Sequence, residues 1–316
     1  MSIMKRRTQR QAWACGAVLL LMLAACGRDA VDPAKPPAEP VAAVQAMARA
    51  VAANDLLAYA RLSVPPAQYR RLQDAWAQGH SRWPLTELPL HDQLLPMLQA
   101  LSAPDGSQQL QRSFERQLAG QTTAVRQAAQ SMGLFGVQYL RHENTITASQ
   151  RSHYIQVVET LAGWAADAPI SDRARARAAI TALTGAARAT GISDDSHLQQ
   201  HGMEGSLQKL GPFIGVLKAV MASYGLDVDE SLRELTGDVL SQQGDNALVR
   251  LQYPLAGQTV SLQIPLTRRE GHWYLTRTLA DTDALLRNAD AAQAESDAAI
   301  APADETGADA MPPAKP

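Results

Sequence analysis

Hydrophobic residues recur every three or four positions over most of the chain between residues 41 and 234. In residues 41–63, for example, Val44, Met47 and Val51 would lie on one side of a helix. This period is typical of helices with one buried face. The same pattern predicts further helices over residues 67–78, 90–101, 110–141, 149–165, 171–190 and 207–224.

Capping and helix-breaking residues set the predicted ends of these helices. Asn54-Asp55 offers a cap or a kink inside the first segment, and Ser171-Asp172 and Asp194-Asp195 cap later helices. Glycines at positions 120, 133 and 136 are expected to interrupt the long segment 110–141. Because the sequence has no repeat of fixed period, a solenoid is not indicated.

At about Leu235 the period changes from 3.6 to 2, which indicates strands with one buried face. The alternation and the short turns between its segments predict an antiparallel four-stranded meander over residues 235–283. Its buried face needs a cover, and the helices are the candidates. The predicted fold class is therefore α+β, with a helix-rich N-terminal and central part (41–234) packed on a C-terminal meander.

The two ends of the body differ from it in composition. Residues 26–40 contain four prolines, which favour an extended linker. Residues 284–316 are acidic and have too little apolar surface to offset the entropy of ordering. We expect a helix that fades by about Ala294, followed by a disordered tail.

Residues 1–25 have the order of a secretory signal peptide. The basic residues Lys5, Arg6, Arg7 and Arg10 come first, and residues 12–25 are apolar or small. The apolar run is too short for a membrane span, which needs about 20 residues. The sequence therefore predicts export.

The signal ends in Leu23-Ala24-Ala25-Cys26, which resembles the lipobox of bacterial lipoproteins. The resemblance implies that a signal peptidase recognises Leu23, Ala24 and Ala25. It also implies that Cys26 becomes the lipidated first residue of the mature chain and anchors it to a membrane. Gly27 stands where many lipoproteins retained in the inner membrane have Asp, so the resemblance implies an outer-membrane location facing the periplasm.

Removal of residues 1–25 would make the protein acidic. The signal takes four of the 29 basic residues and none of the 31 acidic ones, which leaves 25 against 31 and a net charge of −6. Residues 281–316 hold eight acidic and two basic residues, so this excess lies in the tail and the body is neutral. A neutral body argues against nucleic acid as a partner. The acidic tail is a candidate for steering a cationic partner.

Processing would also exclude cysteine chemistry. Cys15 leaves with the signal, and acylation uses the thiol of Cys26. The mature chain then has no disulfide, no thiolate nucleophile and no cysteine metal ligand.

Two segments of the body are similar to NTF2-like (cystatin-like α+β) domains. Residues 50–62 resemble the opening helix pair of that family, and residues 260–266 and 269–275 resemble its closing strands. The resemblance implies a ligand-binding pocket enclosed by helices and sheet. Residues 84–234 depart from the family, because helices are predicted where it has a short link.

Two candidate catalytic patterns lie close together. His197 and His201 have the spacing of zinc ligands on a helix, with Glu204 following, but Leu198 stands where the catalytic zinc motif needs Glu. Ser206 and Lys209 match the Ser-x-x-Lys pattern of penicillin-binding enzymes, but the supporting Lys-Thr-Gly is absent. We therefore predict no metal, no cofactor and no catalytic residue.

Two further patterns have structural interpretations. Gly211 and Gly215 have the spacing of a close helix contact in membranes, but the apolar run is short and Lys218 interrupts it, so a core helix with a close crossing is favoured. Tryptophan side chains are expected to anchor the core rather than to form a sugar-binding platform: Trp76, Trp83, Trp164 and Trp273.

These features favour a lipid-anchored envelope protein that binds or scaffolds, with an envelope protein as candidate partner. The sequence contains no phosphate loop, dinucleotide fingerprint or nucleophile elbow, so catalysis is not the favoured interpretation. The alternative is a periplasmic small-ligand-binding domain of the NTF2-like type, with hydrolytic activity. A deep apolar cavity with converging polar side chains between helices and meander would favour that alternative.

Overall fold

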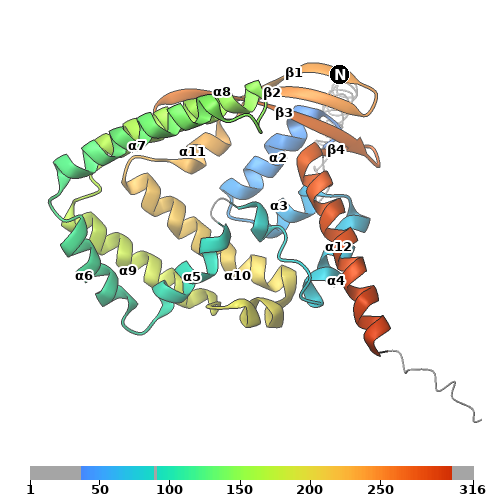
Figure 1. The fold of residues 1–316 in the computed structure, drawn as a ribbon, viewed down its shortest axis with the longest axis horizontal. Coiled ribbons are helices and arrows are strands. Elements are labelled where there is room, and N and C mark those ends of the chain that lie inside the picture. Colours follow the sequence, from blue (N-terminus) through green and yellow to red (C-terminus); the bar gives the residue numbers. More distant parts are fainter. Residues whose placement is uncertain (1–36, 89–90, 301–316) are drawn as a thin grey trace, which may run out of the picture. The chain divides into compact units, whose positions relative to one another are not determined.

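The computed structural model describes residues 37–88 and 91–300. Helices come first, an antiparallel sheet follows, and a long helix closes the described chain (Figure 1). The fold class is therefore α+β, as predicted. The helices are α2 (Pro40–Ala52), α3 (Leu56–Ser63), α4 (Pro66–Ala77), the 3₁₀ helix η1 (Leu85–Glu87), α5 (His91–Ser102), α6 (Gly106–Gln117), α7 (Thr122–His142), α8 (Ala148–Asp167), α9 (Arg173–Thr190), α10 (Asp195–Ser223), α11 (Val228–Arg233) and α12 (Thr276–Ile300).

The sheet is a meander in which each strand pairs antiparallel with the next. Two of its turns have positive φ at both central residues: 45° at Ala256 and 78° at Gly257, then 53° at Glu270 and 80° at Gly271. Turns of this kind match the twist of the strands that they join. The strands are β1 (Thr236–Gln243), β2 (Asn246–Leu255), β3 (Gln258–Arg269) and β4 (His272–Leu275).

Helix α2 covers one face of the sheet and forms a core with it. Val44 and Met47 of α2 pack with Leu251 of β2 and Trp273 of β4, and all four are buried. Alternation along the strands places the apolar residues of β2 and β4 on the side that faces α2. The helices thus cover the buried face of the meander, as the sequence predicted.

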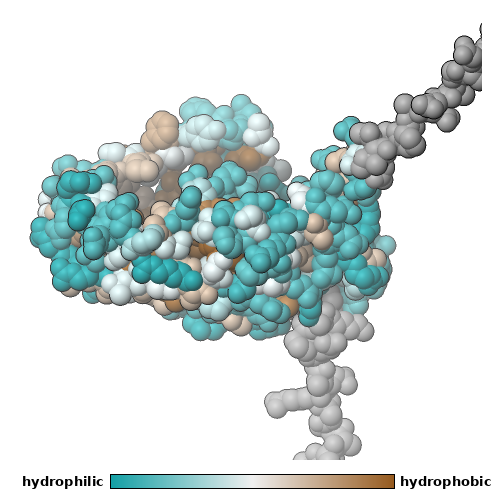
Figure 2. All heavy atoms as spheres, turned by 90° about the horizontal axis from the view of Figure 1, so that it is seen from below, coloured by the Kyte–Doolittle hydropathy of each residue, from teal (hydrophilic) through white to brown (hydrophobic). Residues whose placement is uncertain are grey.

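A second core lies among the helices. Trp76 of α4 is completely buried, and its Nε1 donates a hydrogen bond of 3.2 Å to the backbone oxygen of Leu198 in α10. Phe213 of α10 and Leu286 of α12 belong to the same cluster. Because the large apolar side chains are inside, the face seen from below is mostly hydrophilic (Figure 2).

Helices α7 and α8 run side by side between α6 and the sheet (Figure 1). At the sheet, His153 Nδ1 lies 3.0 Å from the backbone oxygen of Ser261 in β3, and Gln156 Oε1 accepts a hydrogen bond of 3.1 Å from Ser261 N. In the described chain β4 pairs only with residues 266–269 of β3, so Ser261 lies on an open edge. Two side chains of α8 therefore bind the backbone groups that another strand would use.

Helix α7 continues through Gly133 and Gly136, where we expected interruptions. Gly120, with φ of 72°, does separate α6 from α7. A Cβ at Gly133 would lie 2.5 Å from the Cβ of Ala162, and a Cβ at Gly136 would lie 3.1 Å from Val158 Cγ1. These two glycines let α8 approach closely, so the prediction of breaks there was wrong.

The last strand is shorter, and the last helix longer, than predicted. Helix α12 begins at Thr276, before the predicted end of the meander at residue 283, and it continues to Ile300, past the predicted end near Ala294. Residues 284–300 are therefore helix rather than tail, and residues 301–316 lie outside the described residues. Four buried residues recur along α12 with helical spacing: Leu279, Thr282, Leu286 and Ala289. Two of them, Leu279 and Leu286, are large and apolar, and this is enough for the helix to pack against the rest of the protein.

Helix α10 also departs from its predicted bounds. Its N-cap is Asp194, as predicted, and the carboxylate accepts a hydrogen bond from His197 N. The helix then continues to Ser223 through a kink at Gly202, where φ is 66° and ψ is 177°. Because the backbone of Gly202 is not helical, it divides α10 into the two helical segments that the sequence predicted, and the second segment begins after Gly202 rather than at Leu207.

Candidate functional site

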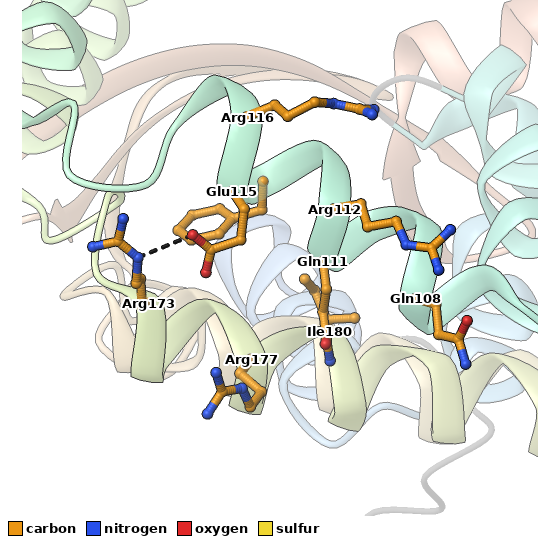
Figure 3. A pocket seen from close by; sticks show the side chains of 9 residues that line it. Gln108, Gln111, Arg112, Glu115, Arg116, Arg173, Arg177 and Ile180 are labelled. Carbon is orange, nitrogen blue, oxygen red and sulfur yellow. Dashed lines mark hydrogen bonds and ion pairs between the residues drawn. The ribbon is translucent and has the colours of Figure 1, made fainter.

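A groove with arginines on both walls lies between helices α6 and α9 (Figure 3). Its volume is about 480 Å³. The wall formed by α6 carries Arg112 and Arg116, and the wall formed by α9 carries Arg173 and Arg177. The remaining lining residues are Gln108, Gln111, Phe114, Glu115 and Ile180.

Helical spacing explains why two arginines of each helix line the same groove. Arg112 and Arg116 are four residues apart, and so are Arg173 and Arg177, so each pair shares one side of its helix. Figure 3 shows Arg112 toward one end of the groove and Arg173 toward the other. The positive charge is therefore spread along the groove.

Contacts at the start of α9 hold the two walls together. The N–H of Gly120, which follows α6, donates a hydrogen bond of 3.2 Å to the backbone oxygen of Ser171. The hydroxyl oxygens of Thr122 and Ser171 are 2.8 Å apart. These bonds fix the turn between α6 and α7 against the residue that precedes the N-cap of α9.

The arginines of α9 lie at the wrong end of their helix for stability. Arg173, Arg175 and Arg177 fall within its first five residues, where the macrodipole is positive and cations are disfavoured. Asp172 caps the helix by accepting a hydrogen bond of 2.7 Å from Arg175 N. An anion bound near these residues would meet favourable charge from both the helix end and the side chains.

Three of the four groove arginines have no side-chain partner among the described residues. Arg173 Nε donates a hydrogen bond of 3.0 Å to Glu115 Oε2. Within the part of the chain that the structure describes, the guanidinium groups of Arg112, Arg116 and Arg177 make no hydrogen bond or ion pair. The four arginines against one carboxylate give the groove a net charge of +3.

The chemistry available in this groove is binding of an anion. Guanidinium groups form paired hydrogen bonds with phosphate or carboxylate oxygens. Among the lining residues, Glu115 is the one that could accept a proton, and it is bonded to Arg173. The lining contains no serine, threonine, cysteine, histidine or lysine that could act as a nucleophile or a general acid.

No family model, no curated protein and no solved structure matches the chain.

The predicted lipidation site cannot be placed in this structure. Cys26 and the recognition residues Leu23, Ala24 and Ala25 lie outside the described residues. The lipobox therefore stays a prediction. Within the described ranges, no helix is both long and apolar enough to cross a membrane.

The suggested zinc pattern contains two side chains that pair with other groups, His197 and Glu204. His197 Nδ1 lies 2.9 Å from Asp194 Oδ1 at the N-terminus of α10. Glu204 accepts hydrogen bonds of 2.9 Å from Arg61 and from the hydroxyl of Tyr69. No group of three or more metal-ligating side chains occurs among residues 37–88 and 91–300.

The Ser-x-x-Lys pattern does not form a catalytic pair. Ser206 is completely buried, and its hydroxyl donates a hydrogen bond of 3.2 Å to the backbone oxygen of Leu198. Lys209 is exposed. Because the serine is closed off from solvent, the pattern has a structural role only.

The glycine pair is explained by close packing. A Cβ at Gly211 would lie 2.4 Å from the backbone oxygen of Asn54, and a Cβ at Gly215 would lie 2.8 Å from its Nδ2. Helix α10 thus crosses the turn between α2 and α3 closely, as expected of a core helix. Of the tryptophans, three are core anchors, whereas Trp164 is half-buried and its Nε1 donates to the backbone oxygen of Tyr224.

The arginine groove was not found from the sequence. Counted over the whole body, charge is balanced, and this balance hides a local cluster. The available signal was the pair of arginine repeats at four-residue spacing, Arg112 with Arg116 and Arg173 with Arg177. Only the packing of α6 against α9 shows that the two repeats share one site.

Proposed function

We propose that the protein is a lipid-anchored envelope protein that binds an anionic ligand in the groove between α6 and α9. The observation that carries the proposal is the absence of any partner for the guanidinium groups of Arg112, Arg116 and Arg177 among the described residues. Helix α9 also holds three of its arginines where its dipole disfavours them. A bound anion would compensate both features.

The arrangement of the charges favours a ligand with more than one anionic group. Arg112 and Arg173 lie toward different ends of the groove, and Arg177 lies between them on the α9 wall (Figure 3). A single small ion would reach part of this charge. An elongated molecule with two or more phosphate or carboxylate groups would contact guanidinium groups on both walls.

Binding has more support than the hydrolytic alternative. The region between α2 and the meander, where an NTF2-like pocket would lie, is filled by apolar side chains. Met47, Leu251 and Trp273 there are at most 4 % exposed. The groove lining also lacks a serine, threonine, cysteine or lysine nucleophile, and its one carboxylate, Glu115, is bonded to Arg173. These features favour a protein that holds its ligand unchanged.

The cellular setting of the proposal comes from the N-terminal pattern. A lipid on Cys26 would attach the protein to the outer membrane, facing the periplasm, and residues 26–40 would form an extended linker. The groove would then be available to soluble anions or to an envelope protein with an acidic segment.

Calorimetric titration of the full chain tests the proposal. Inorganic pyrophosphate and citrate serve as multivalent anions, and maltose serves as a neutral control. We expect both anions to bind with an affinity that falls as salt screens the charges, and to be recovered unchanged. Failure of both anions to bind at low salt, or cleavage of pyrophosphate, would overturn it.

A further inference from the structure

The most exposed large hydrophobic side chains of the described residues lie together on helix α7. Phe135 is 74 % exposed, Met132 73 %, Leu134 71 % and Tyr139 60 %. All four fall within eight consecutive residues. Single exposed apolar residues are common, but a cluster of this kind marks an interaction surface.

The cluster results from how α7 packs. Its inner side meets α8 through Gly133 and Gly136, and Val137 on that side is buried. Close contact through glycines brings the two helices together without enclosing the longer side chains. Phe135 and Met132 therefore stay exposed on the side of α7 that faces away from α8.

Charge is absent from the same stretch. Residues 127–140 contain no Asp, Glu, Lys, Arg or His, and Arg126 and Arg141 stand at either end. Arg141 has no partner within the described ranges, whereas Arg126 Nε donates to the backbone oxygen of Ala166. The carboxylate of Glu143, beyond the end of α7, is occupied by hydrogen bonds from Tyr139 and Thr145.

We infer that the outward face of α7 docks on a lipid surface and lies in the plane of its headgroups. Fourteen uncharged residues extend about 21 Å along a helix, which is less than the hydrocarbon core of about 30 Å, so the helix would lie on the bilayer rather than cross it. Apolar and aromatic side chains would enter the boundary between headgroups and acyl chains. Arg141 would meet phosphates at the edge of the face.

A lipid surface fits the charge pattern of this face. Residues 127–140 have no charged side chain, and their polar side chains are neutral amides and hydroxyls. Such a face matches the boundary between headgroups and acyl chains, and Arg141 stands at its end, where lipid phosphates would lie. The inference is independent of the arginine groove, and it concerns contact by the folded body rather than attachment through the N-terminus.

A local fluorescence readout in the full chain tests the inference. Phe135→Trp places the probe on the outward face of α7, and Val239→Trp places a matched probe on β1 at another exposed apolar position. Each variant is mixed with vesicles of phosphatidylethanolamine and phosphatidylglycerol whose acyl chains carry bromine, which quenches tryptophan on contact. Because both residues replaced are exposed, the variants are expected to fold, and near-ultraviolet circular dichroism checks this.

We expect quenching of the Phe135→Trp variant beyond that of the parent chain, and no added quenching of the Val239→Trp variant. Equal quenching of Phe135→Trp and parent, including the case in which no vesicle binds, would overturn the inference. So would a dimer detected by light scattering that Met132→Gln/Phe135→Gln abolishes, because the face would then be covered by a second copy.

Discussion

Arg173 and Glu115 join the two walls of the arginine groove: Nε of the guanidinium donates a hydrogen bond of 3.0 Å to Oε2 of the carboxylate. The side chains are 61 % and 47 % exposed, so the pair contributes little to stability, on the order of 0.2–1 kcal/mol. Its larger effect is on charge. Glu115 neutralises one of four arginines and leaves three available for a ligand.

Glu115→Gln should strengthen anion binding. The substitution removes the carboxylate that competes with a ligand for Arg173, and it raises the net charge of the groove from +3 to +4. We expect pyrophosphate to bind more tightly in calorimetric titration, with the free energy of unfolding changed by less than about 1 kcal/mol. Weaker binding by this variant would mean that Glu115 holds Arg173 in place for the ligand.

Gly133→Ala should destabilise the protein. The added Cβ would lie 2.5 Å from the Cβ of Ala162, so α7 and α8 would have to move apart, at a cost of about 1–3 kcal/mol. Urea unfolding followed by circular dichroism measures the change.

The same substitution at Gly163 provides the control, because no atom lies within 4 Å of a Cβ there. Gly163→Ala in the interior of α8 should raise the free energy of unfolding by about 0.5–1 kcal/mol. Equal effects of the two substitutions would refute close packing at Gly133.

Glu87 should make stability depend on pH. Burial raises the pKa of its carboxyl above the ordinary value of 4.5, although hydrogen bonds from Trp83, Tyr59 and Thr278 act in the opposite direction. The folded protein therefore holds this proton to a higher pH than the unfolded chain does. Its contribution to stability is complete below the unfolded pKa and is lost as pH rises through the raised pKa.

Urea unfolding of the parent and of Glu87→Gln, from about pH 4 upward, tests this dependence. The variant cannot ionise at this position, so the stability of the parent relative to the variant should fall as pH rises through that window. A difference that stays constant across the series would contradict a raised pKa at Glu87.

Cys26→Ser should release the protein from membranes or leave it unprocessed. The substitution removes the thiol that lipidation would use, and the acyl chains supply durable attachment, since one chain alone binds with a constant of only about 10⁴ M⁻¹. Fractionation of cells that express the parent and the variant measures the effect. Contact through α7 alone would leave weak association, whereas unchanged partitioning of a processed variant would refute the lipobox interpretation.

Local signals in the sequence predicted the elements well, because caps and turns act over a few residues. Asp172 and Asp194 cap their helices as expected. Gly133 misled the prediction because its reason is a neighbouring helix rather than the local backbone. The start of α12 at Thr276 was missed for a similar reason, since packing against α4 supports a helix with few large apolar residues.

The candidate site could not be predicted from the sequence, because its two walls come from helices that are far apart along the chain. Arg112 and Arg177 belong to separate helices, and each repeat alone resembles an ordinary solvated helix face. The folded structure shows which charges stay unpaired, because Glu115 bonds to Arg173 of the other helix rather than to Arg112 of its own.

Titration of pyrophosphate into Arg112→Gln/Arg177→Gln tests the central claim most directly. Arg70→Gln/Arg233→Gln is the matched control, because it removes the same charge from exposed positions outside the groove. The account predicts that the groove variant binds at least about tenfold more weakly than the parent, since it loses charge-assisted hydrogen bonds on both walls, and that the control binds within about twofold. Equal affinities for the groove variant and the parent would contradict it.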